Sequence, residues 1–221
     1  MRLLAPSVLA ADFLHLDSEI AFINEHADIV HLDIMDGVQV PNISFGFPVI
    51  EAVAKIARKP LDIHLMITSP QRYFERFAKV AGPGGMVSFH LEAARKDGND
   101  PAGMLAELKK LGVKAGLVIN PDIPVEDLFP YVKDADYILL MSVFAGFGGQ
   151  SFIPSTYERV RTLKEYIRKT GAECLVEVDG GVDADNADAL AQCGVDIFVA
   201  GSAIFKAADR VAVAEAIKGR N

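Results

Sequence analysis

The sequence predicts an α/β protein built as a (β/α)8 barrel, the TIM barrel fold. Short apolar, β-type runs alternate with amphipathic helical stretches along the whole chain of 221 residues. The alternation repeats eight times, as a closed parallel barrel requires, usually within roughly 250 residues. Chemically unusual polar residues follow many different strands, from the first to the last. An open doubly wound sheet, the alternative fold, would gather such residues at one crevice.

The expected strands are apolar runs bounded by turn residues. They cover residues 3–5, 29–33, 61–66, 86–90, 114–119, 137–142, 175–179 and 197–200.

Amphipathic stretches between these runs predict the helices. They cover residues 16–24, 48–58, 70–80, 101–111, 125–132, 157–169, 185–193 and 209–218. A cap residue or a proline at the first turn marks several starts, at Ser69-Pro70, Asp100-Pro101 and Ser155. Glycines at 112, 171 and 194 end helices. Residues 81–85 and 94–100 have loop composition.

Composition limits the class of protein. Apolar residues make up 51% and charged residues 24%, as in globular proteins, and no linker divides the chain, so we expect residues 1–221 to form one (β/α)8 barrel domain. We find no run of membrane-spanning length and no leader, and Cys174 and Cys193 form no CxxC pair, which predicts a cytoplasmic protein. The net charge of −8 argues against binding to nucleic acid, but it does not exclude a phosphorylated substrate.

The second expected strand carries the strongest chemical signal. Side chains on a strand alternate between its faces, so His31, Asp33 and Met35 share one face. A buried carboxylate is costly unless it is paired or bound to a metal. These residues indicate a site for a metal and a base at the carboxyl end of the strand. A carboxylate that merely caps the next element is the alternative.

Two other strands end in similar residues. The third carries His64 and, two residues later, Met66; the seventh ends in Asp179 followed by two glycines. In a barrel, His31, Asp33, His64 and Asp179 would all point into the mouth. Two imidazoles and two carboxylates suit one divalent transition metal ion per subunit: zinc, iron(II), manganese or cobalt. Singly, each could be an ordinary core or capping residue.

Glycine-rich turns follow the last three strands and indicate a phosphate site. They comprise residues 145–150, 179–181 and 200–203. Backbone amides of the late loops commonly hold a phosphate in this fold, and glycine lets the backbone approach the anion. Plain tight turns are the alternative.

Taken together, these motifs resemble the ribulose-phosphate 3-epimerase family over nearly the whole chain. The matching segments are residues 5–13, 31–37, 40–42, 62–66, 141–143, 146–150, 152–154, 177–181 and 200–202. The resemblance implies a barrel of the ribulose-phosphate-binding type, a divalent metal and a ketopentose phosphate substrate.

Site roles follow from the resemblance, motif by motif. The implied metal ligands are His31, Asp33, His64 and Asp179, of which Asp33 and Asp179 are also the catalytic acid and base. The implied substrate contacts are Ser7, His64, Asp179, the methionines Met35, Met66 and Met141 around the reacting carbons, and, at the phosphate end, Gly146, Phe147, Gly148, Gly149, Gly180, Gly181, Gly201 and Ser202. The resemblance also implies a homo-oligomer.

The implied reaction is epimerisation at C3 of D-ribulose 5-phosphate to D-xylulose 5-phosphate through an ene-diolate. A proton leaves one face of the carbon and returns to the other, so two bases are needed. A metal would stabilise the developing negative charge, and the loop 146–154 could cover the site.

The chain departs from the family pattern at two places near the mouth. Val38-Gln39 stands where His-Phe is usual, and Phe144-Ala145 where Asn-Pro is usual. Both changes leave substrate preference open, so D-allulose-6-phosphate 3-epimerase is an alternative. A phosphate-binding barrel decarboxylase and a non-catalytic binding protein are weaker ones.

The remaining polar residues have ordinary interpretations. We expect His90 to be a core residue and His15 and His26 to lie at the surface. Asp36 either bonds to loop backbone or orients the site.

Overall fold

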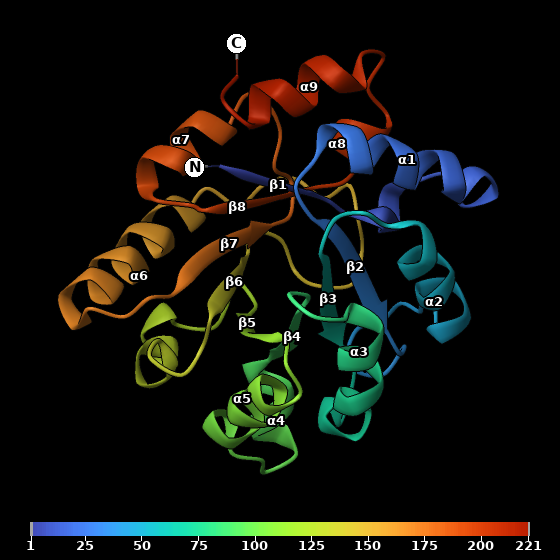
Figure 1. The fold of residues 1–221 in the computed structure, drawn as a ribbon. Coiled ribbons are helices and arrows are strands. Elements are labelled where there is room, and N and C mark those ends of the chain that lie inside the picture. The colour runs from blue at the N-terminus through green and yellow to red at the C-terminus, as the bar shows by residue number, and fades with distance from the viewer. Residues whose placement is uncertain (1, 221) are drawn as a thin grey trace.

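The computed structural model describes residues 2–220. Eight parallel strands form a barrel with helices around its outside, which confirms the predicted fold (Figure 1). The strands are β1 (Leu3–Pro6), β2 (Val30–Met35), β3 (Leu61–Met66), β4 (Met86–His90), β5 (Lys114–Ile119), β6 (Tyr137–Met141), β7 (Leu175–Asp179) and β8 (Ile197–Ala200).

Strand pairing runs β1-β8-β7-β6-β5-β4-β3-β2, and an isolated parallel bridge between Ser7 and His31 brings the first and last members together. The register matters for the site. Asp33 on β2 lies opposite His64 on β3, and Met141 on β6 lies opposite Asp179 on β7. Polar residues from distant segments therefore reach the same level at the carboxyl end of the barrel.

The α-helices are α1 (Leu16–His26), α2 (Phe47–Ile56), α3 (Phe74–Ala81), α4 (Leu91–Lys96), α5 (Pro101–Lys110), α6 (Thr156–Thr170), α7 (Ala187–Cys193), α8 (Ser202–Phe205) and α9 (Arg210–Ile217). Four 3-10 helices join them: η1 (Val8–Ala10), η2 (Phe13–His15), η3 (Pro70–Tyr73) and η4 (Val125–Tyr131). None of these helices is long and apolar enough to cross a membrane.

The structure corrects part of one predicted loop. Residues 94–100 were expected to be irregular, but α4 extends through Lys96. Leu91 and Ala94 bury one side of this short helix in the core, and such packing outweighs the loop-like composition that follows it. The helix expected at 70–80 begins as the 3-10 turn η3, and the one expected at 125–132 is wholly 3-10, with Pro130 inside it.

The capping predictions divide in the same way. Asp100 accepts hydrogen bonds from the amides of Ala102 and Gly103, as a cap should. Ser69 and Ser155 make no such bonds. Ser69 instead bonds to Asp97 from a left-handed conformation, so it joins two loops.

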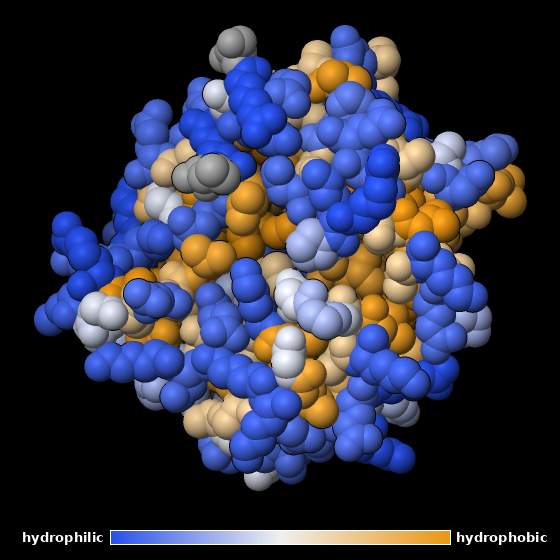
Figure 2. Space-filling view, in the orientation of Figure 1, coloured by the Kyte–Doolittle hydropathy of each residue, from blue (hydrophilic) through white to orange (hydrophobic). Residues whose placement is uncertain are grey.

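Two apolar layers support the barrel. The larger lies between the sheet and its helices, and it contains both cysteines. A smaller one, which includes Ala5, Met86 and Tyr137, fills the amino end of the interior. Tyr137 fits there because Gly116 has no side chain; a Cβ at 116 would lie 2.3 Å from the tyrosine ring. The face seen in Figure 2 is largely hydrophilic with scattered hydrophobic patches.

Candidate active site

Four side chains converge at the carboxyl end of the barrel. One ligand atom from each of His31, Asp33, His64 and Asp179 lies within 4.8 Å of the others. Asp33 Oδ1 is 3.3 Å from His31 Nε2 and 3.1 Å from His64 Nδ1, and Asp179 Oδ2 is 4.0 and 3.9 Å from the same two nitrogens. This mixed nitrogen and oxygen donor set fits a divalent transition metal.

Asp62, Tyr137 and Glu177 surround the other ring nitrogen of His31. Its Nδ1 lies 2.6 Å from Asp62 Oδ2, and Tyr137 donates its hydroxyl hydrogen to Asp62 Oδ1 at 2.9 Å. Glu177 Oε1 lies 3.7 Å from the same Nδ1. Burial and the nearby Asp62 raise the pKa of Glu177 well above its usual range, which favours the uncharged form. The bond to Asp62 fixes the ring so that Nε2 faces the site.

The surroundings of the two histidines shift their pKa values in opposite directions. Burial alone would lower the pKa of His31, but Asp33 and Asp62 overcome this and raise it. The negative charge of Asp33 and Asp62 therefore favours a positive charge at the His31 ring, whether a proton or a bound metal ion. Burial, with the charge of neighbouring His90, lowers the pKa of His64 to about 4. A neutral His64 has a lone pair to offer a metal.

The pKa values of the two carboxyl groups are shifted in opposite directions. Burial would raise the pKa of Asp33, but its contacts with His31 and His64 hold it far below the usual range. For Asp179, burial and the charge of Asp33 act together and raise the pKa to about 7. A pair of carboxyl groups whose pKa values are driven apart suits one proton donor and one proton acceptor.

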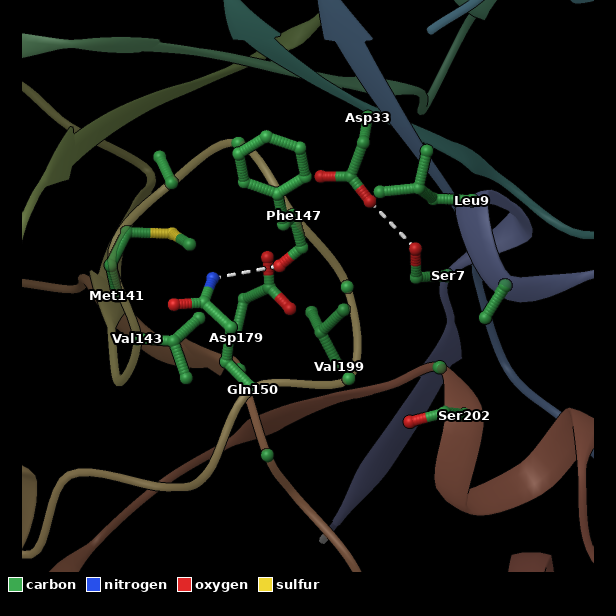
Figure 3. A pocket seen from close by; sticks show the side chains of 18 of the residues that line it. Ser7, Leu9, Asp33, Met141, Val143, Phe147, Gln150, Asp179, Val199 and Ser202 are labelled. Carbon is green, nitrogen blue, oxygen red and sulfur yellow. Dashed lines mark hydrogen bonds between the residues drawn. The ribbon is translucent and has the colours of Figure 1, made fainter. Parts of the chain in front are cut away.

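Ser7 completes this end of the site. It lies just after β1, is buried, and donates a hydrogen bond of 2.6 Å to Asp33 Oδ2 (Figure 3). In the same view Ser7, Leu9 and Asp33 lie on one side of the cavity, and Met141, Val143 and Gln150 lie on the other.

One cavity of about 380 Å³ joins this cluster to the glycine loops. Asp33 and Asp179 line it, whereas the two histidines lie behind its wall. Every other residue that we expected to contact substrate also lines it: Ser7, Met35, Met66, Met141, Gly146, Phe147, Gly148, Gly149, Gly180, Gly181, Gly201 and Ser202. These residues, which lie far apart in the sequence, therefore line a single cavity.

Hydrogen bonds hold the loop after β6 over this cavity. Asn42 donates to the carbonyl of Gly146 at 2.8 Å, which ties the loop after β2 to the loop after β6. Gln150 donates to the carbonyls of Phe144 and Phe147, which closes the loop on itself. Phe147 is half exposed at the rim.

Gly181, in the loop after β7, lies where the cavity wall has no room for a side chain. Its φ is +63°, and a Cβ there would lie 2.7 Å from the backbone nitrogen of Phe152. A side chain would force the two loops apart.

Sequence reasoning missed several lining residues, of which Lys206 is chemically the most distinctive. It is exposed at the end of α8, and it is the one basic side chain that lines the cavity among the described residues. Its place directly after the short helix that follows β8 was a usable signal. Asn42 and Gln150 also line the cavity; both lie in segments that resemble the family, 40–42 and 146–150, but we expected no role for either residue.

The two departures from the family pattern have different positions. Phe144 and Ala145 line the cavity, but Val38 and Gln39 do not. Asp36 turns out to bind backbone: it accepts from the amides of Val38, Gln39 and Thr68 and from the Thr68 hydroxyl.

The other histidines lie where we expected. His15 is exposed beside Asp12, and His26 is partly exposed and packs on Phe22. His90 is buried, as predicted, but it touches His64.

Comparison with known proteins points to one family. The model of the ribulose-phosphate 3 epimerase family matches residues 3–205. A ribulose-phosphate 3-epimerase of Mycobacterium leprae is 40% identical over 99% of this chain and 94% of its own length, and one of Synechocystis is 41% identical over 97% and 91%. Among solved structures, KGPDC from Streptococcus mutans in complex with a sugar phosphate aligns with a TM-score of 0.73 at 13% identity, covering 99% of this chain and 96% of that one.

Proposed function

The chain belongs to the ribulose-phosphate 3-epimerase family and is an isomerase, and on that premise we propose that it converts D-ribulose 5-phosphate to D-xylulose 5-phosphate. The observation that carries the proposal is the pair Asp33 and Asp179, both lining one cavity within a His/Asp cluster. Inversion at C3 needs a proton acceptor on one face of the carbon and a proton donor on the other.

Each carboxyl group has a role that its surroundings support. Asp33 stays ionised between His31 and His64 and takes the C3 proton from one face. Asp179, whose pKa is raised to about 7, delivers a proton to the opposite face of the ene-diolate. In the reverse direction the roles exchange. Ser7 donates to the Asp33 oxygen Oδ2, so it fixes the direction in which this base points.

We propose that the metal ligands are His31 Nε2, His64 Nδ1 and one oxygen each of Asp33 and Asp179, which would hold one zinc, iron(II), manganese or cobalt ion per subunit. When bound, the ion supplies Lewis-acid stabilisation of negative charge on the substrate oxygens.

The other end of the cavity suits the substrate's phosphate group. Residues 146–149, Gly180, Gly181, Gly201 and Ser202 line it, so their backbone amides would hold the phosphate group, and Lys206 supplies a positive charge. A dianion would be favoured there because, among the described residues, the other titratable groups that line the cavity are the two aspartates at its metal end. The sugar phosphate in the S. mutans KGPDC shows that another protein of this fold binds such a ligand.

The walls between the two ends are apolar. Met35 and Met66 pack together with Val40, and Met141 packs with Val143. Thioether side chains adapt to the sugar and have no proton to donate, so they would not compete with the two aspartates for the reacting carbon.

A second candidate substrate is D-allulose 6-phosphate, which would undergo the same reaction with one more carbon. The observation that favours keeping it is the position of Phe144 and Ala145, which line the cavity and depart from the pentose-enzyme pattern. A decarboxylase of the phosphate-binding barrel type has less support, because among the described residues the ion-pair partners of the two aspartates are histidines and not a lysine.

The test compares turnover of the two sugar phosphates by one purified preparation: as isolated, after chelation, and after each metal is added back. We expect the pentose phosphate to be strongly preferred, the chelator to abolish turnover and a metal to restore it. Preference for the hexose phosphate would replace the proposed substrate and keep the mechanism. Undiminished turnover after complete removal of metal would contradict the metal-dependent mechanism.

A further inference from the structure

We propose that His90 and Glu92 are positioning residues that hold His64 in the one tautomer able to bind a metal. The inference rests on the metal-dependent function proposed above. Neither residue belongs to the group of converging ligand atoms. His90 is the last residue of β4, which pairs with the strand β3 that carries His64, and Glu92 lies in the first turn of α4, directly after β4.

The contact between the two histidines is close and fully buried. His64 Nε2 lies 2.9 Å from His90 Nε2, and the rings stack at 5.1 Å between centroids with 17° between planes. At this separation the two nitrogens share one hydrogen, so one of them donates and the other accepts. Which one donates decides what the opposite nitrogen of each ring can do.

Only one arrangement leaves the metal position available. If His64 Nε2 donates, then His64 Nδ1 keeps its lone pair and faces Asp33 and Asp179 as a ligand. His90 must then accept through Nε2 and carry its own hydrogen on Nδ1. If His90 donates instead, a neutral His64 carries its hydrogen on Nδ1, and this nitrogen cannot bind a metal.

Glu92 selects the productive arrangement from the far side of His90. Its Oε2 lies 3.7 Å from His90 Nδ1, and each of these two buried atoms has no other partner among the described residues. Burial alone would raise the pKa of Glu92, but His90 and the amide of Asn120 lower it, so Glu92 is a carboxylate that only accepts. A carboxylate beside Nδ1 favours the hydrogen on that nitrogen.

The carboxylate is itself held in place. Glu92 Oε1 accepts from the amide of Asn120 at 2.9 Å, and the Asn120 side chain accepts from the amide of Ala145 at 3.0 Å. The chain of contacts therefore runs from the loop over the cavity, through Asn120, Glu92 and His90, to His64.

The first test measures the affinity of the protein for Zn²⁺ by competition with a chromophoric chelator. His90→Leu removes the acceptor and should raise the zinc dissociation constant roughly 10- to 100-fold. His90→Gln offers an amide oxygen in its place and should recover most of the affinity. Glu92→Gln should weaken binding in the same direction by a smaller factor.

Glu19→Gln is the matched control. Glu19 is also a buried carboxylate, but it pairs with Arg210 at 2.6 Å, away from the cluster. Its zinc affinity should equal that of the wild type. If folded His90→Leu binds Zn²⁺ as tightly as the wild type does, the proposal is wrong.

The second test reads the tautomers directly from the ¹⁵N chemical shifts of the histidines in the zinc-loaded wild type, and so decides the matter even if His90→Leu does not fold. We expect hydrogen on His90 Nδ1 and on His64 Nε2. Hydrogen on His90 Nε2 would overturn the inference. A wild type that binds no Zn²⁺, or that turns over fully without metal, would instead refute the proposed function.

Discussion

The two ends of the cavity, which we propose bind the metal (the metal end) and the phosphate group (the phosphate end), use different parts of the chain. At the metal end the converging groups are side chains on β2, β3 and β7, and His31, Asp33 and His64 are buried. At the phosphate end the lining comes from glycine-rich loops after β6, β7 and β8, together with the exposed Lys206.

The difference shows how each end is kept in position. Each histidine at the metal end touches another buried polar residue, His31 through Asp62 and His64 through His90, so the loss of one member leaves another unpaired. The phosphate end depends on close approach of two loops, where space matters more than charge. Substitutions should therefore act on chemistry at the first end and on shape and affinity at the second.

The largest effect should come from the two aspartates. Asp33→Asn and Asp179→Asn each remove an acid/base group, so kcat should fall by about 10²- to 10⁴-fold. Steady-state turnover of D-ribulose 5-phosphate measures this. Asp17→Asn, an exposed aspartate on α1, should keep wild-type kcat. If kcat falls less than tenfold in both Asp33→Asn and Asp179→Asn, the chemistry does not depend on the metal end as proposed.

A smaller effect is expected where the loops meet. Gly181→Ala must place a Cβ 2.7 Å from the Phe152 nitrogen at a φ of +63°, so the free energy of unfolding should fall by about 1–3 kcal/mol and the KM should rise. Urea unfolding and the KM for the sugar phosphate measure the two effects. Gly148→Ala meets open space and should leave stability unchanged. Equal stability of both variants would show that the loops have room to shift.

Lys206→Gln should weaken the phosphate end without touching the chemistry. We expect kcat/KM to fall about tenfold, or about 1.4 kcal/mol, with kcat nearly unchanged. The loss should shrink as salt is added, because an exposed charge is screened. Kinetics from low to high ionic strength test this, with the exposed Lys55→Gln as control. An unchanged KM at low salt would assign phosphate binding to the backbone alone.

The smallest effect concerns the loop after β2. Four hydrogen bonds, two of them from Thr68, lower the pKa of Asp36 although partial burial alone would raise it. Its contribution to stability is therefore complete above the ordinary pKa of 3.8 and is lost as the pH falls through the lower folded value. Asp36→Asn should cost about 1 kcal/mol at pH 7 and less at pH 3, by urea unfolding at both. An equal cost at both values would exclude a role of the charge.

Strand alternation made the metal end predictable. His31 and Asp33 had to share a face, and the registry with β3 brings His64 opposite Asp33. The contact between His64 and His90 could not be predicted. The two residues are 26 positions apart on neighbouring strands, and their contact depends on how the rings are oriented. Lys206 was missed because a single lysine in a loop belongs to no periodic pattern, although its place after the short helix that follows β8 was a usable signal. The α4 helix was partly missed because tertiary burial of Leu91 and Ala94, not composition, stabilises it.

The pairing of Gly116 with Tyr137 gives the barrel one closed end. The tyrosine ring occupies the interior beside the glycine, within an apolar layer that also includes Ala5 and Met86, and its hydroxyl caps Asp62 on the upper side. The cavity that reaches the two aspartates lies at the other end of the barrel, where residues of the loop after β6 line it. In the proposed reaction, sugar phosphate would fill that cavity, so a proton removed from the carbon would exchange with bulk solvent only as the sugar arrives or leaves.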